Sequence, residues 1–235
     1  MTQPTHDSMH EIRYDGHKFR MEYVFKAEIA ALRASRAGQF QEVPVLEWIK
    51  SLKLKGVYFD AGAHVGNHSI FFHSFCPSTA VISVEAHPQI FRLLERNMDR
   101  NAFALCNVPP PGPHRKPFYL HNAAVWKEHG QVSIGAIPHN NAGHTKLADK
   151  GGTMVPARTV DDLSDQGPVV LFKIDVEDVE EEVIMGAQRV LRDDHPVIVA
   201  ERHSEKQLAD FEKLIKPFGY KRSANWAGIH TYAWR

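Results

Sequence analysis

The sequence predicts an α/β fold, in which a Rossmann-like, mostly parallel sheet is closed by an antiparallel strand pair and preceded by a small N-terminal extension. Two observations support this prediction. From Gly56 onward, short apolar runs alternate with segments of helical periodicity, which is the pattern of βα units. Two of these runs, residues 57–60 and 169–175, end in an acidic residue, and the carboxyl ends of parallel strands form the ligand crevice in such folds.

Residues 1–53 are expected to form the extension and residues 54–235 the main domain. Within the extension, the pair Asp15 and Gly16 lies between two apolar segments, which is a strong signal for a hairpin turn. Helix formers fill residues 27–36 and stop before a glycine, and residues 44–52 begin with a proline, which suits the first turn of a helix. The extension is therefore expected to hold one hairpin and two helices.

The main domain is expected to alternate strands and helices in chain order. Apolar runs predict strands over residues 57–60, 80–85, 118–125, 131–134, 169–175 and 197–201. Helical periodicity predicts helices over residues 67–75, 88–101, 180–191 and 205–217. The second of these helices starts at Pro88 and carries one apolar face. Residues 220–222 and 230–234 predict the closing antiparallel pair.

Two long segments lack both kinds of periodicity. Residues 109–117 are rich in proline, and residues 135–155 are polar and rich in Gly, Asn and His. Both are expected to be loops. Because long loops in compact domains often cover binding sites, residues 136–155 are expected to act as a lid.

The composition is that of an ordinary globular protein, with 43% hydrophobic and 24% charged residues. Lys plus Arg and Asp plus Glu both number 28, so no global field favours nucleic acid or a membrane surface. The sequence shows no signal-peptide pattern and no uncharged apolar run of about 20 residues. Its two cysteines, Cys76 and Cys106, form no CxxC motif. A cytoplasmic protein is expected, without nucleic acid or membrane as a partner.

The turn after residues 57–60 reads Asp60-Ala61-Gly62-Ala63-His64-Val65-Gly66. Its first glycine allows a tight bend, and its second allows close packing where the helix starts. The spacing is not GxGxxG, which counts against NAD and FAD. Glu85 closes the next strand, 25 positions after Asp60, where an acid can bind both hydroxyls of a ribose.

Acids at these strand ends suit a nucleoside cofactor that carries a positive charge, and S-adenosylmethionine has both properties. Ala86 is expected beside the adenine. At the end of the third strand, Asn122 and Ala123 leave room for a planar base whose edge Asn122 can bond, although a plain strand end is an equally good interpretation. The expected cofactor-binding residues are Asp60, Ala61, Gly62, Ala63, His64, Gly66, Asn67, Glu85, Ala86, Asn122, Ala123 and Asp175.

An ordered series of segments resembles the FkbM family of S-adenosylmethionine-dependent methyltransferases over about residues 56–220. The matching segments are residues 59–66, 85–88, 158–163, 173–177 and 201–203, together with Val183, Gly186 and Ala187. The resemblance implies a class I methyltransferase fold. It also implies methylation of a hydroxyl, usually on a sugar or a small metabolite, so the expected partner is a small-molecule or glycan acceptor.

The chain departs from the family pattern at two points. Asp178 stands where the family has a glycine after the position of Glu177, which adds a carboxylate near the expected site. Ala86 follows Glu85 where the family often has a proline. Asp178 keeps a second interpretation open, namely a methyltransferase-like binding domain without activity.

Asp175, Glu177 and His203 are the expected catalytic residues. Carboxylates beside a sulfonium favour the charged cofactor over its neutral product, and a base must take the acceptor proton during direct SN2 transfer. Glu177 and His203 are the candidates for this base. As alternatives, Glu177 can serve as the N-terminal acid of a helix, and His203 can be a surface residue. Lys173 is expected to point away from the site.

Three other classes of function are less well supported. His64 and His68 are spaced for one helix face, but no Glu follows His64 and no third ligand is evident, so no metal is expected. The glycine spacing disfavours an NAD-dependent oxidoreductase. The zero net charge disfavours a nucleic-acid methyltransferase.

Overall fold

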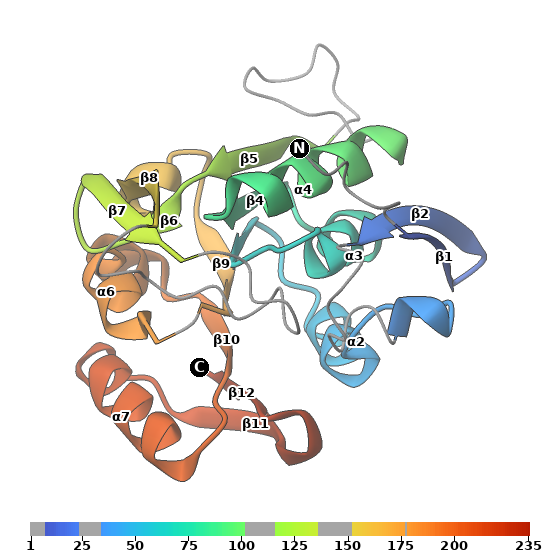
Figure 1. Ribbon diagram of the computed structural model, residues 1–235. Helices are drawn as coiled ribbons and strands as arrows, with labels where there is room; N and C mark the ends of the chain where they lie inside the picture. The colour runs from blue at the N-terminus through green and yellow to red at the C-terminus, as the bar shows by residue number, and fades with distance from the viewer. Residues whose placement is uncertain (1–7, 24–33, 102–115, 136–151, 177) are drawn as a thin grey trace.

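The computed structural model describes residues 8–23, 34–101, 116–135, 152–176 and 178–235. Its main element is a seven-stranded sheet of order β11-β12-β10-β9-β3-β4-β5 (Figure 1). These strands are β3 (Val57–Ala61), β4 (Ala80–Glu85), β5 (Phe118–Asn122), β9 (Val169–Ile174), β10 (Val197–Glu201), β11 (Arg222–Trp226) and β12 (Thr231–Trp234).

The predicted parallel sheet and its closing antiparallel pair are confirmed. Strands β3, β4, β5, β9 and β10 are parallel, and β12 runs antiparallel to both β10 and β11. The chain moves outward from β3 to β5 and then returns to β9 on the other side of β3. This reversal makes the β3–β9 boundary the topological switch point, where ligands bind in open α/β sheets. Ala61 pairs with Ile174, so both strands end at the same level.

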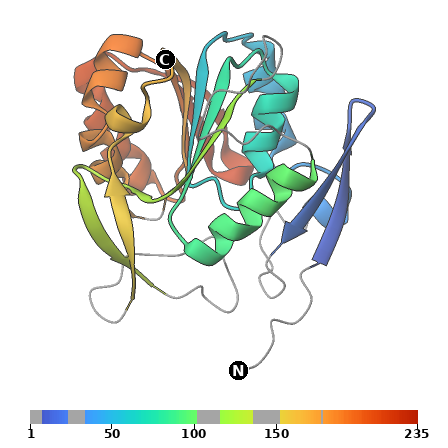
Figure 2. The same ribbon diagram turned by 90° about the horizontal axis from the view of Figure 1, so that it is seen from above.

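Helices cover both faces of this sheet (Figure 2). One layer contains α2 (Val43–Ser51), α3 (Asn67–Phe75) and α4 (Pro88–Arg100); the other contains α5 (Val160–Leu163), α6 (Glu180–Met185), the π-helical turn η1 (Val190–Asp194) and α7 (Glu205–Ile215). Short 3-10 turns, η2 (Lys216–Phe218) and η3 (Ala227–Ile229), flank β11. Because successive side chains of a strand point to opposite faces, Tyr58 joins the first core and Phe59 the second.

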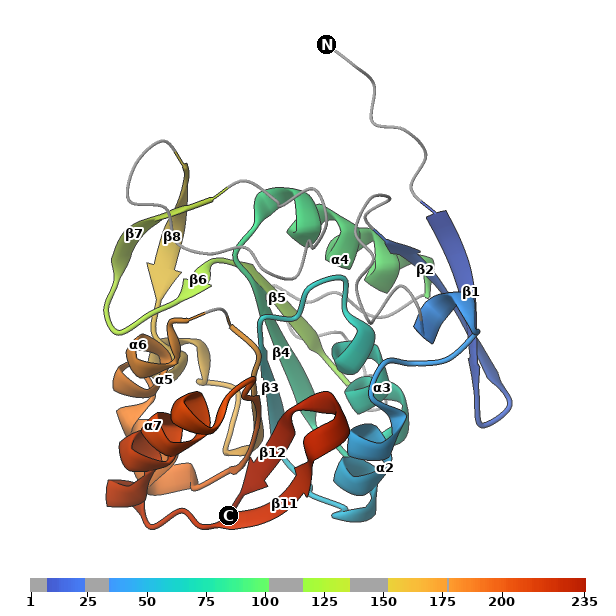
Figure 3. The ribbon, with the colours of Figure 1, turned by 60° about the horizontal axis from the view of Figure 1, so that its bottom comes forward.

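The predicted hairpin is confirmed as β1 (Ser8–Tyr14) and β2 (His17–Tyr23), and it packs beside α4 (Figure 3). Asn97 of α4 joins the two elements. Its Oδ1 accepts from the backbone N–H of Glu22 at 2.7 Å, and its Nδ2 donates to the Glu22 carbonyl at 3.0 Å. Apolar side chains of the hairpin and of α2 share one core with α3, so the extension is built into the main fold.

A second, three-stranded sheet corrects the prediction for residues 118–155. The expected strand 118–125 is interrupted at Ala123, and β6 (Ala124–Val125) joins β7 (Gly130–Ile134) and β8 (Thr153–Arg158) in the order β6-β8-β7. The expected loop is therefore wrong from Thr153 onward, because residues 153–157 of β8 pair with β7. Residues 136–151 lie outside the described part, as do residues 109–115 of the proline-rich segment.

The expected helix over residues 180–191 is interrupted: α6 ends at Met185, and helical structure resumes at Gln188. Gly186 explains the break, since a Cβ at this position would lie 2.1 Å from the Trp126 carbonyl oxygen. The chain continues through Ala187 into η1. Of the expected helix at 27–36, only residues 34–36 are described, and they are helical.

None of the described helices combines the length and the apolar character that crossing a bilayer requires.

Candidate functional site

The crevice at the switch point is built around Gly62, the first residue after β3. Its φ of +78° is in the left-handed region, and a Cβ there would lie only 1.9 Å from the Asp175 carbonyl oxygen. On the other side of the boundary, the Asp175 N–H donates to the Ala61 carbonyl at 3.0 Å. The two strand ends are therefore in direct backbone contact, and only glycine fits between them.

Glu85 lies at the end of β4, next to this turn, and only 8% of the residue is exposed. Its Oε2 accepts from the His64 N–H at 3.0 Å, and its Oε1 accepts from the His87 N–H at 2.7 Å. Burial raises the pKa of the Glu85 carboxyl to about 7, although these two backbone donors favour the ionised form. Each oxygen retains a lone pair that can accept a ligand hydroxyl.

Asn122, at the end of β5, holds the turn that follows Glu85. Its Nδ2 donates to the carbonyls of Glu85 and Ala86, at 2.9 and 3.0 Å. Its two amide hydrogens are thus used within the protein, which leaves Oδ1 as the atom that can meet the edge of a base. Ala123 is buried, and its N–H donates to the Glu85 carbonyl at 3.2 Å.

Lys173 contradicts the expectation that it points away from the site. Its Nζ lies 3.1 Å from Asp60 Oδ1 and 3.1 Å from Asp175 Oδ2. Burial alone would lower the pKa of Lys173, but the two carboxylates outweigh it and raise that pKa. Residues two apart on a strand share a face, which is why Lys173 and Asp175 meet.

Asp60 is fully buried, and its contacts are internal. Oδ2 accepts from the Ser69 hydroxyl at 2.5 Å, and Oδ1 faces Lys173. In this structure Asp60 therefore supports the lysine, and its direct contact with a cofactor stays a prediction. Asp175 is more accessible, with 36% of its side chain exposed. Burial would raise the pKa of Asp175, but the nearby Lys173 lowers it, so the carboxylate is ionised at neutral pH.

Three more expected cofactor residues lie in the turn before α3. His64 has a φ of +51°, and its Nε2 is buried without a hydrogen-bond partner in the described part of the chain. Burial lowers the pKa of His64 to about 4, so the ring is neutral at pH 7. A Cβ at Gly66 would touch Met98 and Leu94, which confirms close packing there. The Asn67 side chain turns to the extension, where Oδ1 accepts from the Gln41 N–H at 3.1 Å.

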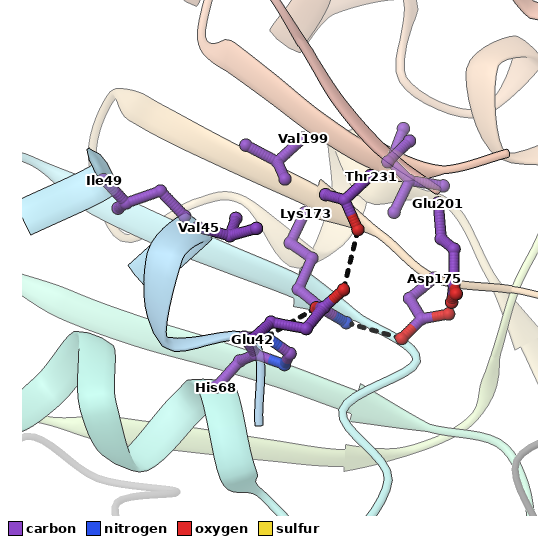
Figure 4. Close-up of a pocket in the computed structure, with 11 residues that line it drawn as sticks. Glu42, Val45, Ile49, His68, Lys173, Asp175, Val199, Glu201 and Thr231 are labelled. Carbon is purple, nitrogen blue, oxygen red and sulfur yellow. Dashed lines mark hydrogen bonds and ion pairs between the residues drawn. The ribbon is translucent and has the colours of Figure 1, made fainter. Parts of the chain in front are cut away.

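A cavity of about 10 Å³, with room for about one water, lies beside Asp175 (Figure 4). Its polar lining comes from α3, β9, β10, β12 and the turns that precede α2 and follow β9. The lining residues are Glu42, His68, Lys173, Asp175, Glu201 and Thr231. Glu42 precedes α2 in the N-terminal extension. Its Oε2 lies 3.1 Å from His68 Nε2, and its Oε1 accepts from the Thr231 hydroxyl at 2.7 Å.

The other expected catalytic residues are placed less centrally. The side chain of His203 is 45% exposed, and its Nε2 lies 3.9 Å from Glu201 Oε1. Its ring packs edge-on against that of His230, with centroids 5.6 Å apart. Glu177 lies outside the described residues, so its role stays a prediction. No cluster of three or more His, Cys, Asp or Glu suited to a metal ion is found among the residues that were placed.

Comparison with known proteins now identifies the fold and the family. Residues 60–222 match the family model of the methyltransferase FkbM domain. The chain belongs to the FkbM methyltransferase family. Its seven-stranded sheet is that of the class I methyltransferases, and the family is one of S-adenosylmethionine-dependent enzymes.

The chain is also similar to solved structures of methyltransferases, one of them with a TM-score above 0.5. A methyltransferase FkbM from Methylobacillus flagellatus is 16% identical, with a TM-score of 0.55; the match covers 77% of this chain and 42% of that one. A precorrin-6y C5,15-methyltransferase from Geobacter metallireducens is 18% identical, with a TM-score of 0.45, over 81% and 84% of the two chains. This chain thus spans less than half of the FkbM structure that it resembles. No curated protein matches it.

Asp161, which belongs to an FkbM-family motif outside the crevice, has a structural role in this chain. Asp161 accepts from the N–H groups of Arg189 and Val190, both at 2.9 Å, and so caps the start of η1. Asp178, which replaces the family glycine, has a φ of +60°. Aspartate tolerates this left-handed conformation better than most residues, so the departure keeps the backbone path that glycine would take. It therefore gives no structural reason to favour an inactive domain.

Sequence reasoning missed Glu42, His68 and Thr231 as neighbours in one site, and it misplaced Lys173. The lysine carried a signal, since an ionisable residue inside the buried run Val169–Ile174 needs a partner, and Asp175 follows on the same face. Glu42 and Thr231 carried no such signal in the sequence, because they are 189 positions apart and come into contact only in the tertiary fold.

Proposed function

We propose that this FkbM-family chain binds S-adenosylmethionine across the ends of β3 and β4 and methylates a hydroxyl of a sugar or another small metabolite. The observation that carries the proposal is the placement of Glu85 and Asp175 on opposite sides of the Gly62 turn. When bound, the cofactor supplies an electrophilic methyl group on a positively charged sulfur. The acceptor is a small molecule or a glycan, and the balanced charge of the chain supports this over a nucleic acid.

The residues present fit this cofactor. Glu85 offers two carboxylate oxygens, held in place by backbone donors, to the two ribose hydroxyls. Gly62 leaves a cradle that any Cβ would fill. Asp175 supplies a negative charge on the side where the sulfonium would lie, and a neutral His64 adds no opposing positive charge.

Each described residue has a distinct role in the transfer. Lys173 keeps its proton, so it fixes Asp60 and Asp175 rather than acting as a base. The cavity next to Asp175 and Glu42 has room for about one hydroxyl-sized group. Catalysis then depends mainly on holding the acceptor oxygen in line with the methyl group.

A radiolabelled methyl-transfer assay tests the proposal directly. The protein is incubated with methyl-labelled S-adenosylmethionine and a panel of methyl glycosides, small alcohols, amines and carboxylic acids. We expect labelled product from hydroxyl acceptors, with a methyl ether identified by NMR. Transfer only to amines or carboxylates would contradict O-methylation while leaving the enzyme class intact.

The pH dependence of cofactor binding is expected to report on Glu85. Its folded pKa of about 7 means that the carboxyl is protonated in the free protein below that pH, whereas bonds to ribose hydroxyls favour the carboxylate. Cofactor binding must then release a proton at low pH. We expect affinity for S-adenosylhomocysteine to be roughly tenfold weaker at pH 6 than at pH 8, by calorimetry.

Two variants separate this effect from other titrations. Glu85→Gln cannot ionise, so it is expected to bind weakly at both pH values and to lose most of the pH dependence. Glu95→Gln, on the exposed face of α4, is the matched control and should bind like the wild type. A wild-type pH profile in Glu85→Gln would show that another group titrates on binding.

A further inference from the structure

Glu42 and His68 lie side by side in the lining of the cavity next to Asp175. Glu42 reaches from the N-terminal extension to the first turn of α3, and 12% of its side chain and 8% of that of His68 are exposed. Burial alone would raise the pKa of Glu42, but its bonds to His68 and Thr231 outweigh this and lower it. A buried carboxylate is thus held ionised beside an imidazole that lines the cavity.

The pairing determines which nitrogen of His68 can act. Glu42 Oε2 faces Nε2, so the neutral ring is expected to carry its proton on Nε2 and a lone pair on Nδ1. No described residue forms a hydrogen bond with Nδ1. An imidazole with a carboxylate 3.1 Å from one nitrogen is oriented by that charge, and the carboxylate stabilises the cation that forms when the other nitrogen takes a proton.

Most other ionisable groups at the cavity or near it are poorly suited to this task. Lys173 is already protonated between two carboxylates. The pKa of Asp175 is lowered by that lysine, and burial holds the pKa of His64 at about 4, so both hold a proton weakly at neutral pH. Glu201 lines the cavity from β10. His203 has 45% of its side chain exposed.

We propose that His68 takes the proton of the acceptor hydroxyl, and that Glu42 positions it. The inference rests on the proposed function and names the base at that site. The acceptor oxygen forms the bond to the methyl carbon, the carbon–sulfur bond breaks with its electron pair remaining on sulfur, and the acceptor proton moves to Nδ1. His68 is then a catalytic residue, Glu42 a positioning residue, and the N-terminal extension part of the active site.

Kinetics on four proteins test the proposal: the wild type, His68→Gln, Glu42→Gln and the surface control Glu95→Gln, each with a methyl glycoside that the wild type methylates. We expect His68→Gln to lower kcat about 100-fold. Glu42→Gln should lower it about 10-fold, because the imidazole loses the carboxylate that orients it. Glu95→Gln, on the exposed face of α4, should keep the wild-type kcat. Affinity for S-adenosylhomocysteine, which shows that each variant folds, should stay within about twofold of the wild type.

NMR of the protein with ¹⁵N-labelled histidine, bound to S-adenosylhomocysteine, gives a readout independent of turnover. We expect the neutral form of His68 to carry its proton on Nε2, and Glu42→Gln to weaken this preference. A proton on Nδ1, or wild-type kcat in His68→Gln, would overturn this inference alone. A folded wild type that binds no S-adenosylhomocysteine would overturn the proposed function, and this inference with it.

Discussion

Replacing Lys173 by methionine is expected to destabilise the protein by about 3–5 kcal/mol, because the change leaves the fully buried Asp60 without its charge partner. Methionine fills similar space, so the effect reports on charge rather than on a cavity. The Ser69 hydroxyl alone cannot neutralise the Asp60 carboxylate. For a chain of this size the melting temperature should fall by roughly 10 °C, measured by differential scanning calorimetry.

A double variant separates charge from packing. In Lys173→Met with Asp60→Asn, both charges are removed, so most of the lost stability should return. Lys206→Met, at a side chain with 89% exposure on α7, is the matched control and should leave the melting temperature unchanged. If Lys173→Met melts like the wild type, the ion pair with Asp60 is not what holds the site together.

Replacing Gly62 by alanine is expected to reduce the affinity for S-adenosylmethionine at least about 100-fold, because a shift of the turn misplaces every group that it carries. The added Cβ would lie 1.9 Å from the Asp175 carbonyl oxygen, which is backbone and cannot rotate away. The φ of +78° adds strain for any residue with a side chain. Both the β3 turn and the end of β9 must therefore move. Calorimetric titration measures the affinity.

Gly130→Ala is the control for this change. A Cβ at Gly130 meets no atom within 4 Å, and the backbone there has no positive φ, so both stability and cofactor affinity should match the wild type. Gly62→Ala with the wild-type affinity would mean that the crevice tolerates a wider turn than this structure allows.

The regular elements of the fold were accessible from the sequence because local signals agreed with tertiary structure. The expected helix at 67–75 and the expected strands at 80–85 and 197–201 have the predicted bounds. Strand β8 was not predicted because its alternation of buried and exposed residues spans only six positions and includes Pro156. The break in the helix over 180–191 was not predicted because periodicity continues past Gly186, whereas the close approach of Trp126 interrupts the helix there.

The candidate site was predictable only as far as it lies at strand ends. Glu85 and Gly62 could be found because each follows a recognisable apolar run. Lys173 was misjudged because its neighbours in sequence are apolar, and its partner Asp60 is on another strand. The contact between Glu42 and His68 was not predicted, because it depends on how the N-terminal extension packs against α3. The local sequence carries no signal for this packing.

Calorimetric titration of the folded wild-type protein with S-adenosylmethionine and S-adenosylhomocysteine tests the central claim most directly. We predict that both ligands bind at one site, that Glu85→Gln weakens both, and that a ligand at 100 times its Kd adds about 2.7 kcal/mol to the free energy of unfolding. A folded protein that binds neither ligand, and whose melting temperature neither ligand raises, would contradict the assignment of the β3–β4 crevice as the cofactor site.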